Sequence, residues 1–274
     1  MTDNLDRCYD VVVSCVKHVG EIIKERIWQT KAKVDAKSCD IDLVTETDQE
    51  VEKFLITNLK NNFPDHMFIG EENVSEGGKC DLTDKPTWII DPVDGTMNFV
   101  HGYPNVCISV ALLVNKVPEI AIIYNPVINY MFEARRGLGA KLNGQRIQVS
   151  KETELSKSLV AFEFGTSRDP EKQKNVLENI TSLIGKVHGV RSAGSAAMNM
   201  AFVALGSCDV YFEFGTHAWD VAAGDLLVRE AGGVVIDPAG GDFDVLSRRV
   251  LAASTRSVAD KLIKELSQHY PERD

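Results

Sequence analysis

Several common active-site motifs are missing from this 274-residue sequence. It has no G-x-x-x-x-G-K-[ST], no G-x-S-x-G and no H-E-x-x-H, so P-loop, serine-hydrolase and zincin chemistry lose their main support. Gly137-Leu138-Gly139-Ala140 lacks the third glycine of a dinucleotide fingerprint. An EF-hand calcium loop is missing as well. Any metal or phosphate chemistry must therefore come from another arrangement of residues.

The sequence also lacks C-x-x-C pairs and long apolar runs. Its cysteines lie far apart, which argues against zinc ribbons and disulfide frameworks and predicts reduced thiols. They are Cys8, Cys15, Cys39, Cys80, Cys107 and Cys208. No run of about 18 apolar residues occurs, and the start has no basic and apolar signal segment. We therefore expect no membrane association and a cytoplasmic protein.

Positive charge is in short supply. Lys and Arg total 30 against 40 Asp and Glu, which gives a formal net charge of −10. Nucleic acids and anionic membranes require clustered Lys and Arg, so neither is expected as a partner. The acidic balance favours a protein that recruits cations.

No repeat or linker divides the chain. We expect one layered α/β domain over residues 1–274, with two closely packed halves of roughly 1–150 and 151–274. Apolar spacing predicts a helix over 4–28, and the Thr47-x-x-Glu50 capping-box pattern predicts a second helix from near Thr47. The later expected strands are 88–90, 106–114, 120–124, 130–134, 159–164, 210–214, 234–236 and 250–253, and the later helices are 171–184, 195–205, 219–231 and one ending near 267.

Carboxylates follow the short apolar strand Trp88-Ile89-Ile90. Asp91 comes at the tip of that strand, where ligand sites of α/β proteins usually lie, and Pro92 stiffens the turn that leads to Asp94. Two unpaired carboxylates held together remain ionised easily only with a cation between them. Oxygen ligands without soft donors indicate magnesium or manganese rather than zinc.

Each of these residues also has a structural interpretation. Asp-Pro-x-Asp-Gly on its own favours an exposed turn whose acids cap a helix, and Asp220 suits the first turn of a helix. Glu213 has the ordinary position of a surface charge, and His217 beside the acidic residues is more typical of a packed or solvated side chain. Gly70-Glu71-Glu72 upstream and Trp219-Asp220 in the second half favour a metal site.

At these residues the sequence resembles the inositol monophosphatase family of magnesium-dependent, lithium-sensitive phosphatases, in its animal form. The likeness covers nearly the whole chain, and its motifs are Gly70-Glu71-Glu72, 88–99 with His101, Gly194-Ser195-Ala196, and 219–233. It implies an alternating α–β–α–β–α sandwich of the type shared with fructose-bisphosphatases. It also implies a homodimer.

The resemblance further implies two magnesium ions. Glu71, Asp91 and the carbonyl of Val93 would hold one ion. Asp91, Asp94 and Asp220 would hold the other. A third, weaker ion near Glu71 is expected, with Mn²⁺ as a substitute and Li⁺ as an inhibitor.

The same resemblance assigns roles to neighbouring residues. Thr96, helped by Asp48 and by Glu71 at the metal, would orient and deprotonate the attacking water, and the amides of Gly95 and Thr96 would bind phosphate oxygens. Lys37 lies in a loop that family members fold toward the metal site. The residues implied to meet the substrate hydroxyls are Asp94, Gly194, Ser195, Ala196, Glu213 and Asp220.

The function expected from this resemblance is Mg²⁺-dependent hydrolysis of myo-inositol monophosphates, by a metal-activated water and without a covalent intermediate. The alternatives on the same fold are phosphatases of galactose 1-phosphate, fructose 1,6-bisphosphate or adenosine 3′,5′-bisphosphate. A second phosphate or an adenine ring needs basic or aromatic contacts, which the sequence does not reveal. A non-catalytic metal-binding scaffold is the remote alternative, since all the expected ligands are present.

Overall fold

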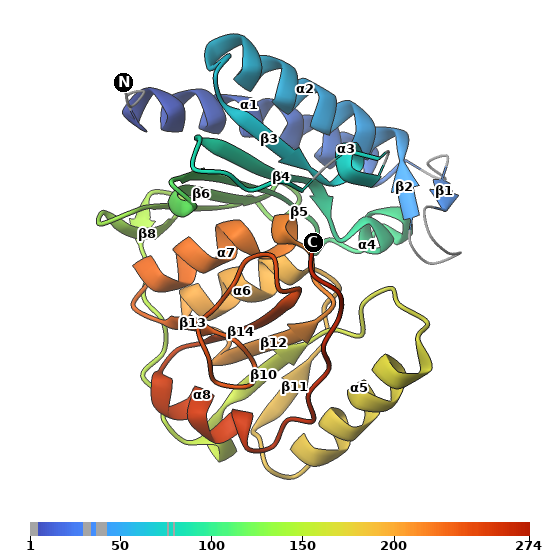
Figure 1. Cartoon of the computed structure of the whole chain (residues 1–274), viewed down its shortest axis with the longest axis vertical. Coiled ribbons are helices and arrows are strands. Elements are labelled where there is room, and N and C mark those ends of the chain that lie inside the picture. The colour runs from blue at the N-terminus through green and yellow to red at the C-terminus, as the bar shows by residue number, and fades with distance from the viewer. Residues whose placement is uncertain (1–4, 30–33, 37–42, 76, 79) are drawn as a thin grey trace.

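Helices and sheets alternate in layers in the computed structural model, which describes residues 5–29, 34–36, 43–75, 77–78 and 80–274. Figure 1 shows α1 (Leu5–Arg26) and α2 (Glu46–Asn62) above the first sheet, and α6 (Ala196–Leu205) with α7 (Ala218–Glu230) between the two sheets. Helices α5 (Pro170–Leu183) and α8 (Arg256–Ile263) cover the other face of the second sheet. The predicted α–β–α–β–α sandwich is confirmed.

The first sheet has seven strands in the order β3-β4-β5-β6-β7-β8-β9. Only β3 and β4 pair in parallel, and the other neighbours are antiparallel. Along β4, Trp88 and Ile90 face the helices α1 and α2, whereas Ile89 faces α7, so both faces are buried. The strands are β3 Met67–Gly70, β4 Thr87–Asp94, β5 Cys107–Val114, β6 Val117–Asn125, β7 Tyr130–Arg135, β8 Gly139–Leu142 and β9 Gln145–Arg146.

The second sheet has five strands in the order β11-β10-β12-β14-β13. Strands β11, β10 and β12 run parallel, and β14 is antiparallel to both of its neighbours. They are β10 Leu159–Phe162, β11 Gly189–Arg191, β12 Val210–Phe214, β13 Val234–Ile236 and β14 Arg249–Ala253. The remaining elements are the paired strands β1 Val34–Ala36 and β2 Leu43–Thr45, the helices α3 Glu71–Ser75 and α4 Thr96–His101, and the 3-10 turn Leu155–Lys157.

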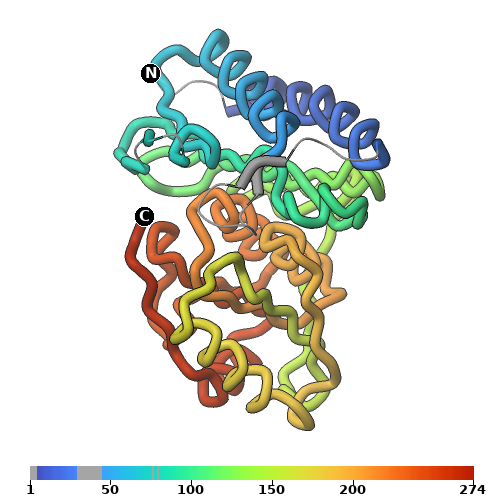
Figure 2. Tube along the Cα trace, turned by 90° about the vertical axis from the view of Figure 1, so that its right-hand side faces the viewer, coloured from blue at the N-terminus to red at the C-terminus, as the bar shows by residue number. Residues whose placement is uncertain are grey.

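The main hydrophobic core lies between the two sheets, around α6 and α7. It joins Ile89 and Ile123 of the first sheet to Tyr211 and Val250 of the second. Gly224 brings α7 close to α6, because a Cβ there would come within 2.4 Å of the sulfur of Met200. Figure 2 shows the same stack from a second direction, with both halves of the chain in contact. The boundary near residue 150 stays a prediction, since this core takes residues from both sides of it.

The structure differs from the predicted capping box of α2 and from several predicted boundaries. Helix α2 begins at Glu46, within one residue of its predicted start near Thr47, but its N-cap is Thr45, and the capping box is Thr45 with Asp48 rather than Thr47 with Glu50. Strand β4 does not stop at Asp91 but continues to Asp94 through a bulge. Helix α8 ends at Ile263, because the amide of Ser267 donates to Asn179 of α5 instead of to a helix carbonyl.

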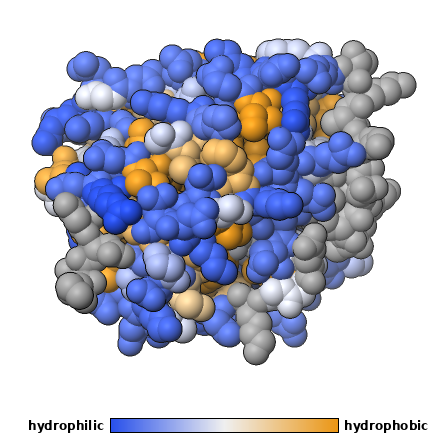
Figure 3. Space-filling view, turned by 90° about the horizontal axis from the view of Figure 1, so that it is seen from above, coloured by the Kyte–Doolittle hydropathy of each residue, from blue (hydrophilic) through white to orange (hydrophobic). Residues whose placement is uncertain are grey.

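The surface and the cysteines agree with the sequence. No helix among the described residues is long and apolar enough to cross a membrane. Figure 3 shows a mainly hydrophilic face over α1 and α2. Of the cysteines, Cys8, Cys15, Cys80, Cys107 and Cys208 are free thiols, and Cys39 lies outside the described residues.

Candidate active site

A bulge in β4 turns Asp91 and Asp94 to the same side. Asp91 pairs with Ser109 and Asp94 with Cys107, so three steps along β4 face two along β5. Residues three apart in a regular strand point to opposite faces, and the extra residue corrects this. Pro92 lies inside the bulge, where its missing N–H removes no ladder hydrogen bond.

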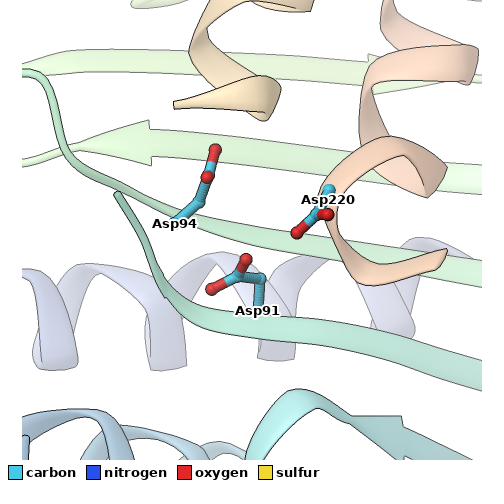
Figure 4. A group of neighbouring side chains, drawn as sticks. All are labelled: Asp91, Asp94 and Asp220. Carbon is cyan, nitrogen blue, oxygen red and sulfur yellow. The ribbon is translucent and has the colours of Figure 1, made fainter. Parts of the chain in front are cut away.

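Asp220, in the first turn of α7, completes a group of three carboxylates. One oxygen from each of Asp91, Asp94 and Asp220 lies within 4.8 Å of the others. Figure 4 shows the three side chains around a common space, two from β4 and one from α7. Residues separated by more than a hundred positions thus meet at one point.

Burial and mutual repulsion act on these three acids. Burial, followed by the charges of Glu71 and Asp94, raises the pKa of Asp91 well above its usual range. Burial and then the charge of Asp94 do the same to the pKa of Asp220. Burial raises the pKa of Asp94 to about 6, even though it accepts hydrogen bonds that favour its ionised form. A divalent cation would offset this repulsion, so the donor set fits a hard metal ion.

Asp94 and Asp220 are held by neighbouring hydrogen-bond donors. The Ser195 hydroxyl and the Ala197 amide donate to Oδ2 of Asp94 at 2.6 and 2.7 Å. The amide of His217 donates to Oδ2 of Asp220 at 2.6 Å, so Asp220 caps the start of its own helix. The other oxygen of Asp220 accepts no protein hydrogen bond within the described chain.

Glu71 stands beside this group without belonging to the tight cluster. It is the first residue of α3, directly after β3, and it lines the same cleft as Asp91. A hydrogen bond with Glu71 contributes to the raised pKa of Asp91. The structure therefore brings Glu71 next to Asp91, which is the arrangement that the predicted first metal requires.

Thr96 and Asp48 form a hydrogen-bonded pair at the edge of the acidic cluster. The Thr96 hydroxyl lies 3.0 Å from Oδ1 of Asp48 and 3.1 Å from the carbonyl oxygen of Val93. Oδ2 of Asp48 accepts the amide of Thr45 at 3.0 Å and also contacts the Thr45 hydroxyl. Burial raises the pKa of Asp48 to about 6. The helix cap thus fixes the carboxylate that faces Thr96.

Gly95 and the segment from Gly194 to Ala196 approach each other across the cleft. Gly95 has a φ of 92°, and a Cβ there would come within 3.0 Å of the Gly194 carbonyl oxygen. Asn98 joins the two segments by donating to the carbonyl oxygens of Ala193 and Gly194 at 2.8 and 3.2 Å. Only glycine at position 95 allows this approach without strain.

Glu163 and Asn98 support the site in ways that sequence reasoning missed. The Glu163 carboxylate accepts the amides of Ala193 and Gly194 at 2.7 and 2.8 Å and the side chain of Asn199 at 2.7 Å. Asn98 belongs to a motif that the sequence analysis quoted, but nothing marked its side chain as a bridge. No sequence signal identified Glu163, because its partners lie about thirty residues further on.

The carboxylates Glu71, Asp91, Asp94 and Asp220 line one cleft of about 1280 Å³ together with Thr96 and the Gly194 segment, whereas Asp48 is buried behind Thr96 and is not part of the cleft wall. Glu213 at the end of β12 forms part of its wall, and burial raises the pKa of Glu213 to about 7. Basic and aromatic side chains are also present, including Lys172, Arg168 and Phe164. The expectation that such contacts are lacking is therefore wrong, because their positions in sequence gave no hint that they face the site. Lys37 lies outside the described residues.

Comparison with known proteins agrees with this geometry. The model of the "Inositol monophosphatase family" matches residues 4–270. The chain is 48% identical to inositol monophosphatase 1 of Homo sapiens over all of this chain and 99% of that protein. It is 46% identical to inositol monophosphatase 2 of Mus musculus, over 93% of this chain and 88% of that protein.

A solved structure gives the same result for the fold. The inositol monophosphatase from Anabaena (Nostoc) superposes with a TM-score of 0.83 at 33% identity, covering 96% of each chain. The non-catalytic scaffold is not supported, because these relatives are phosphatases. From the carboxylate cluster, the family match and these relatives together, we conclude that the chain is a phosphatase belonging to the inositol monophosphatase family.

Proposed function

We propose that this protein hydrolyses myo-inositol monophosphates to myo-inositol and phosphate in a Mg²⁺-dependent reaction without a covalent intermediate. The observation that carries the proposal is the convergence of Asp91, Asp94 and Asp220 on the wall of one cleft. The names of the relatives support the inositol phosphate.

The charge of the cleft explains why a metal is required. A phosphate monoester is a dianion, and buried carboxylates alone would repel it. Glu71, Asp91 and the Val93 carbonyl would hold one Mg²⁺, and Asp91, Asp94 and Asp220 a second. When bound, such ions neutralise the carboxylates, bind phosphate oxygens and lower the pKa of water.

Thr96 and Asp48 are the groups that would move the proton of the attacking water. The Thr96 hydroxyl is 3.0 Å from Oδ1 of Asp48, so a proton accepted by Thr96 can pass directly to that carboxylate. The water oxygen forms the new bond to phosphorus, and the ester bond to the alcohol breaks. The alcohol oxygen takes up a proton from solvent water and leaves, and Asp48 returns its proton to solvent before the next turnover.

The opposite walls of the cleft would hold the two parts of the substrate. The amides of Gly95 and Thr96, at the start of α4, would bind phosphate oxygens. The alcohol would face Glu213, the segment Gly194, Ser195 and Ala196, and the outer oxygens of Asp94 and Asp220. The Asn98 bridge would keep these two walls at a fixed separation.

Phosphate release from inositol 1-phosphate tests this proposal. We expect activity that requires Mg²⁺, disappears with EDTA and falls more than about a hundredfold in Asp91→Asn. Activity that survives both EDTA and Asp91→Asn would contradict the proposal. Galactose 1-phosphate, fructose 1,6-bisphosphate and adenosine 3′,5′-bisphosphate belong in the same assay, and faster turnover of any of them would reassign the substrate.

The family resemblance supports four further proposals. We infer that a third ion binds near Glu71, that Mn²⁺ substitutes for Mg²⁺, and that Li⁺ inhibits. We also infer a homodimer from the resemblance. Separately, we infer from the composition a cytoplasmic protein without nucleic-acid or membrane partners. Metal titrations of activity test the three proposals about ions. Light scattering of the purified protein tests the dimer.

A further inference from the structure

Lys172 is a buried lysine that lines the cleft. It lies on α5 with only 4% of its surface exposed. Its ammonium group sits between two glycines, because a Cβ at Gly165 or Gly215 would come within 2.5 or 2.7 Å of Nζ. A side chain at either position would displace the ammonium, so the local backbone leaves space for it.

The backbone amide of Lys172 donates to Asp169 at 3.0 Å, but nothing in the described chain uses the donors of its side-chain ammonium group. Among the described residues, no carboxylate comes within ion-pair distance of Nζ and no hydrogen bond reaches it. Burial lowers the pKa of Lys172, and the charge of Glu213 opposes that shift. A buried ammonium without partners destabilises a fold, so this lysine needs another explanation.

Glu213 places a hydrogen-bond acceptor next to this donor. The position that a Cβ of Gly165 would take is 2.5 Å from Nζ of Lys172 and 3.5 Å from Oε1 of Glu213. The other oxygen of Glu213 accepts the hydroxyl of Tyr211 at 2.5 Å. The wall therefore presents a donor and an acceptor side by side that do not satisfy each other.

The other cations of the cleft differ from Lys172. Arg248 donates to the carbonyl oxygens of Gly215 and Thr216 and contacts Nε2 of His217. Arg168 is exposed at the mouth of the cleft. Within the described chain, Lys172 is the buried cation of the cleft whose donors remain available.

We propose that Lys172 determines specificity for polyols by donating a hydrogen bond to a hydroxyl oxygen of the leaving alcohol, next to the hydroxyl that donates to Glu213. This inference rests on the proposed function. A donor beside an acceptor matches two neighbouring hydroxyl groups, since one can accept while the other donates. A second phosphate fits less well, because the Glu213 carboxylate would repel it.

Steady-state kinetics on two substrates test the inference. Inositol 1-phosphate offers neighbouring hydroxyls, whereas phenyl phosphate has none. The ratio of kcat/KM for these two substrates should fall about tenfold in Lys172→Met, mainly through KM, and less in Lys172→Gln, which keeps a donor. Lys174→Met removes an exposed lysine of the same helix and should leave the ratio unchanged.

Thermal unfolding separates binding from a structural role. Lys172→Met removes a buried charge without partners, so its Tm should equal or exceed that of the unchanged protein. An unchanged substrate ratio in an active enzyme overturns the inference alone. A larger loss on an inositol bisphosphate than on inositol 1-phosphate also overturns it, since Lys172 would then bind a second phosphate. If the unchanged protein releases no phosphate from inositol 1-phosphate with Mg²⁺, both proposals fail.

Discussion

The side-chain carboxylate of Asp274 lies 2.6 Å from Nδ1 of His217, at the start of the helix that carries Asp220. Its other oxygen accepts the amide of Ala218 at 3.0 Å. Figure 1 shows this end of the chain beside α7, between the two halves. His217 in turn donates its amide to Asp220. The last residue of the sequence thus fixes the helical turn from which a proposed metal ligand projects.

Asp274→Ala should weaken metal binding while the fold persists. Loss of the carboxylate frees the first turn of α7, and we expect an approximately tenfold higher Mg²⁺ concentration at half-maximal activity. Asp274→Asn keeps an acceptor for the Ala218 amide and should show a smaller shift. Exposed Glu272 is the matched control, and Glu272→Ala should behave like the unchanged protein. Equal Mg²⁺ dependence in all variants would exclude this role.

Asp220→Asn should abolish turnover without unfolding the protein. The amide oxygen can still accept the His217 amide, so the helix start is preserved. The substitution also removes one of three repelling carboxylates, so the metal-free variant should be at least as stable at neutral pH. We expect a loss of more than about a hundredfold in kcat and no rise of Tm on addition of Mg²⁺. A variant that melts well below the unchanged protein would show that Asp220 is structural.

Thr96→Val should reduce kcat with little effect on KM. The isosteric change deletes the hydroxyl that faces Asp48 and Val93, and a lost proton-transfer group usually costs about 10²-fold or more. Thr96→Ser retains the hydroxyl and should keep most of the activity. Similar kcat values for the valine and serine variants would rule out the proton path through Thr96.

Glu213→Gln should change how stability depends on pH. Burial, helped by the charge of Glu163, raises the pKa of Glu213 from 4.5 to about 7. The folded protein therefore binds this proton more tightly than the unfolded chain does. The stability contributed by Glu213 is fully present below about pH 4.5 and is lost as the pH rises to about 7.

Urea unfolding in EDTA at several pH values measures this contribution. As the pH rises from 4.5 to 7, the free energy of unfolding should fall less in Glu213→Gln than in the unchanged protein, by up to roughly 3 kcal/mol. Asp48 and Asp94 also have raised pKa values in this window, so only the difference between the two proteins reports on Glu213. Glu272→Gln, at an exposed position, should show no difference. Parallel curves for Glu213→Gln and the unchanged protein would contradict the assignment.

The periodic parts of the fold were predictable because apolar spacing reports directly on burial. The helices α1, α5, α6 and α7 lie within one or two residues of their predicted ranges. The capping box of α2 was not predictable, because Thr45 and Thr47 each have an acidic residue three positions further on. The end of α8 depends on Asn179, which is far away in sequence.

The residues of the site were predictable as a set, but their geometry was not. The strand tip and the turn after it marked Asp91 and Asp94, and the family resemblance assigned them with Asp220 to one site, whereas a regular strand would put the first two on opposite faces. Lys172 falls in a predicted helix among charged neighbours, which is typical of a solvated surface. Its burial follows from the packing of Gly165 and Gly215, and the sequence carries no sign of that contact.

The bulge in β4 makes the length of this segment as important as its residue types. Deletion of Val93 would restore a regular ladder with Asp91 and Asp94 two positions apart, and therefore still on one face, but it would remove the carbonyl oxygen that accepts the Thr96 hydroxyl. Insertion of one residue beside the bulge would add a step between the two aspartates and turn one of them into the opposite layer, although every aspartate would remain in the sequence. Pro92 and Val93 should therefore tolerate substitution better than insertion or deletion. The number of residues between Asp91 and Asp94 thus matters to this strand as much as the two acidic residues themselves.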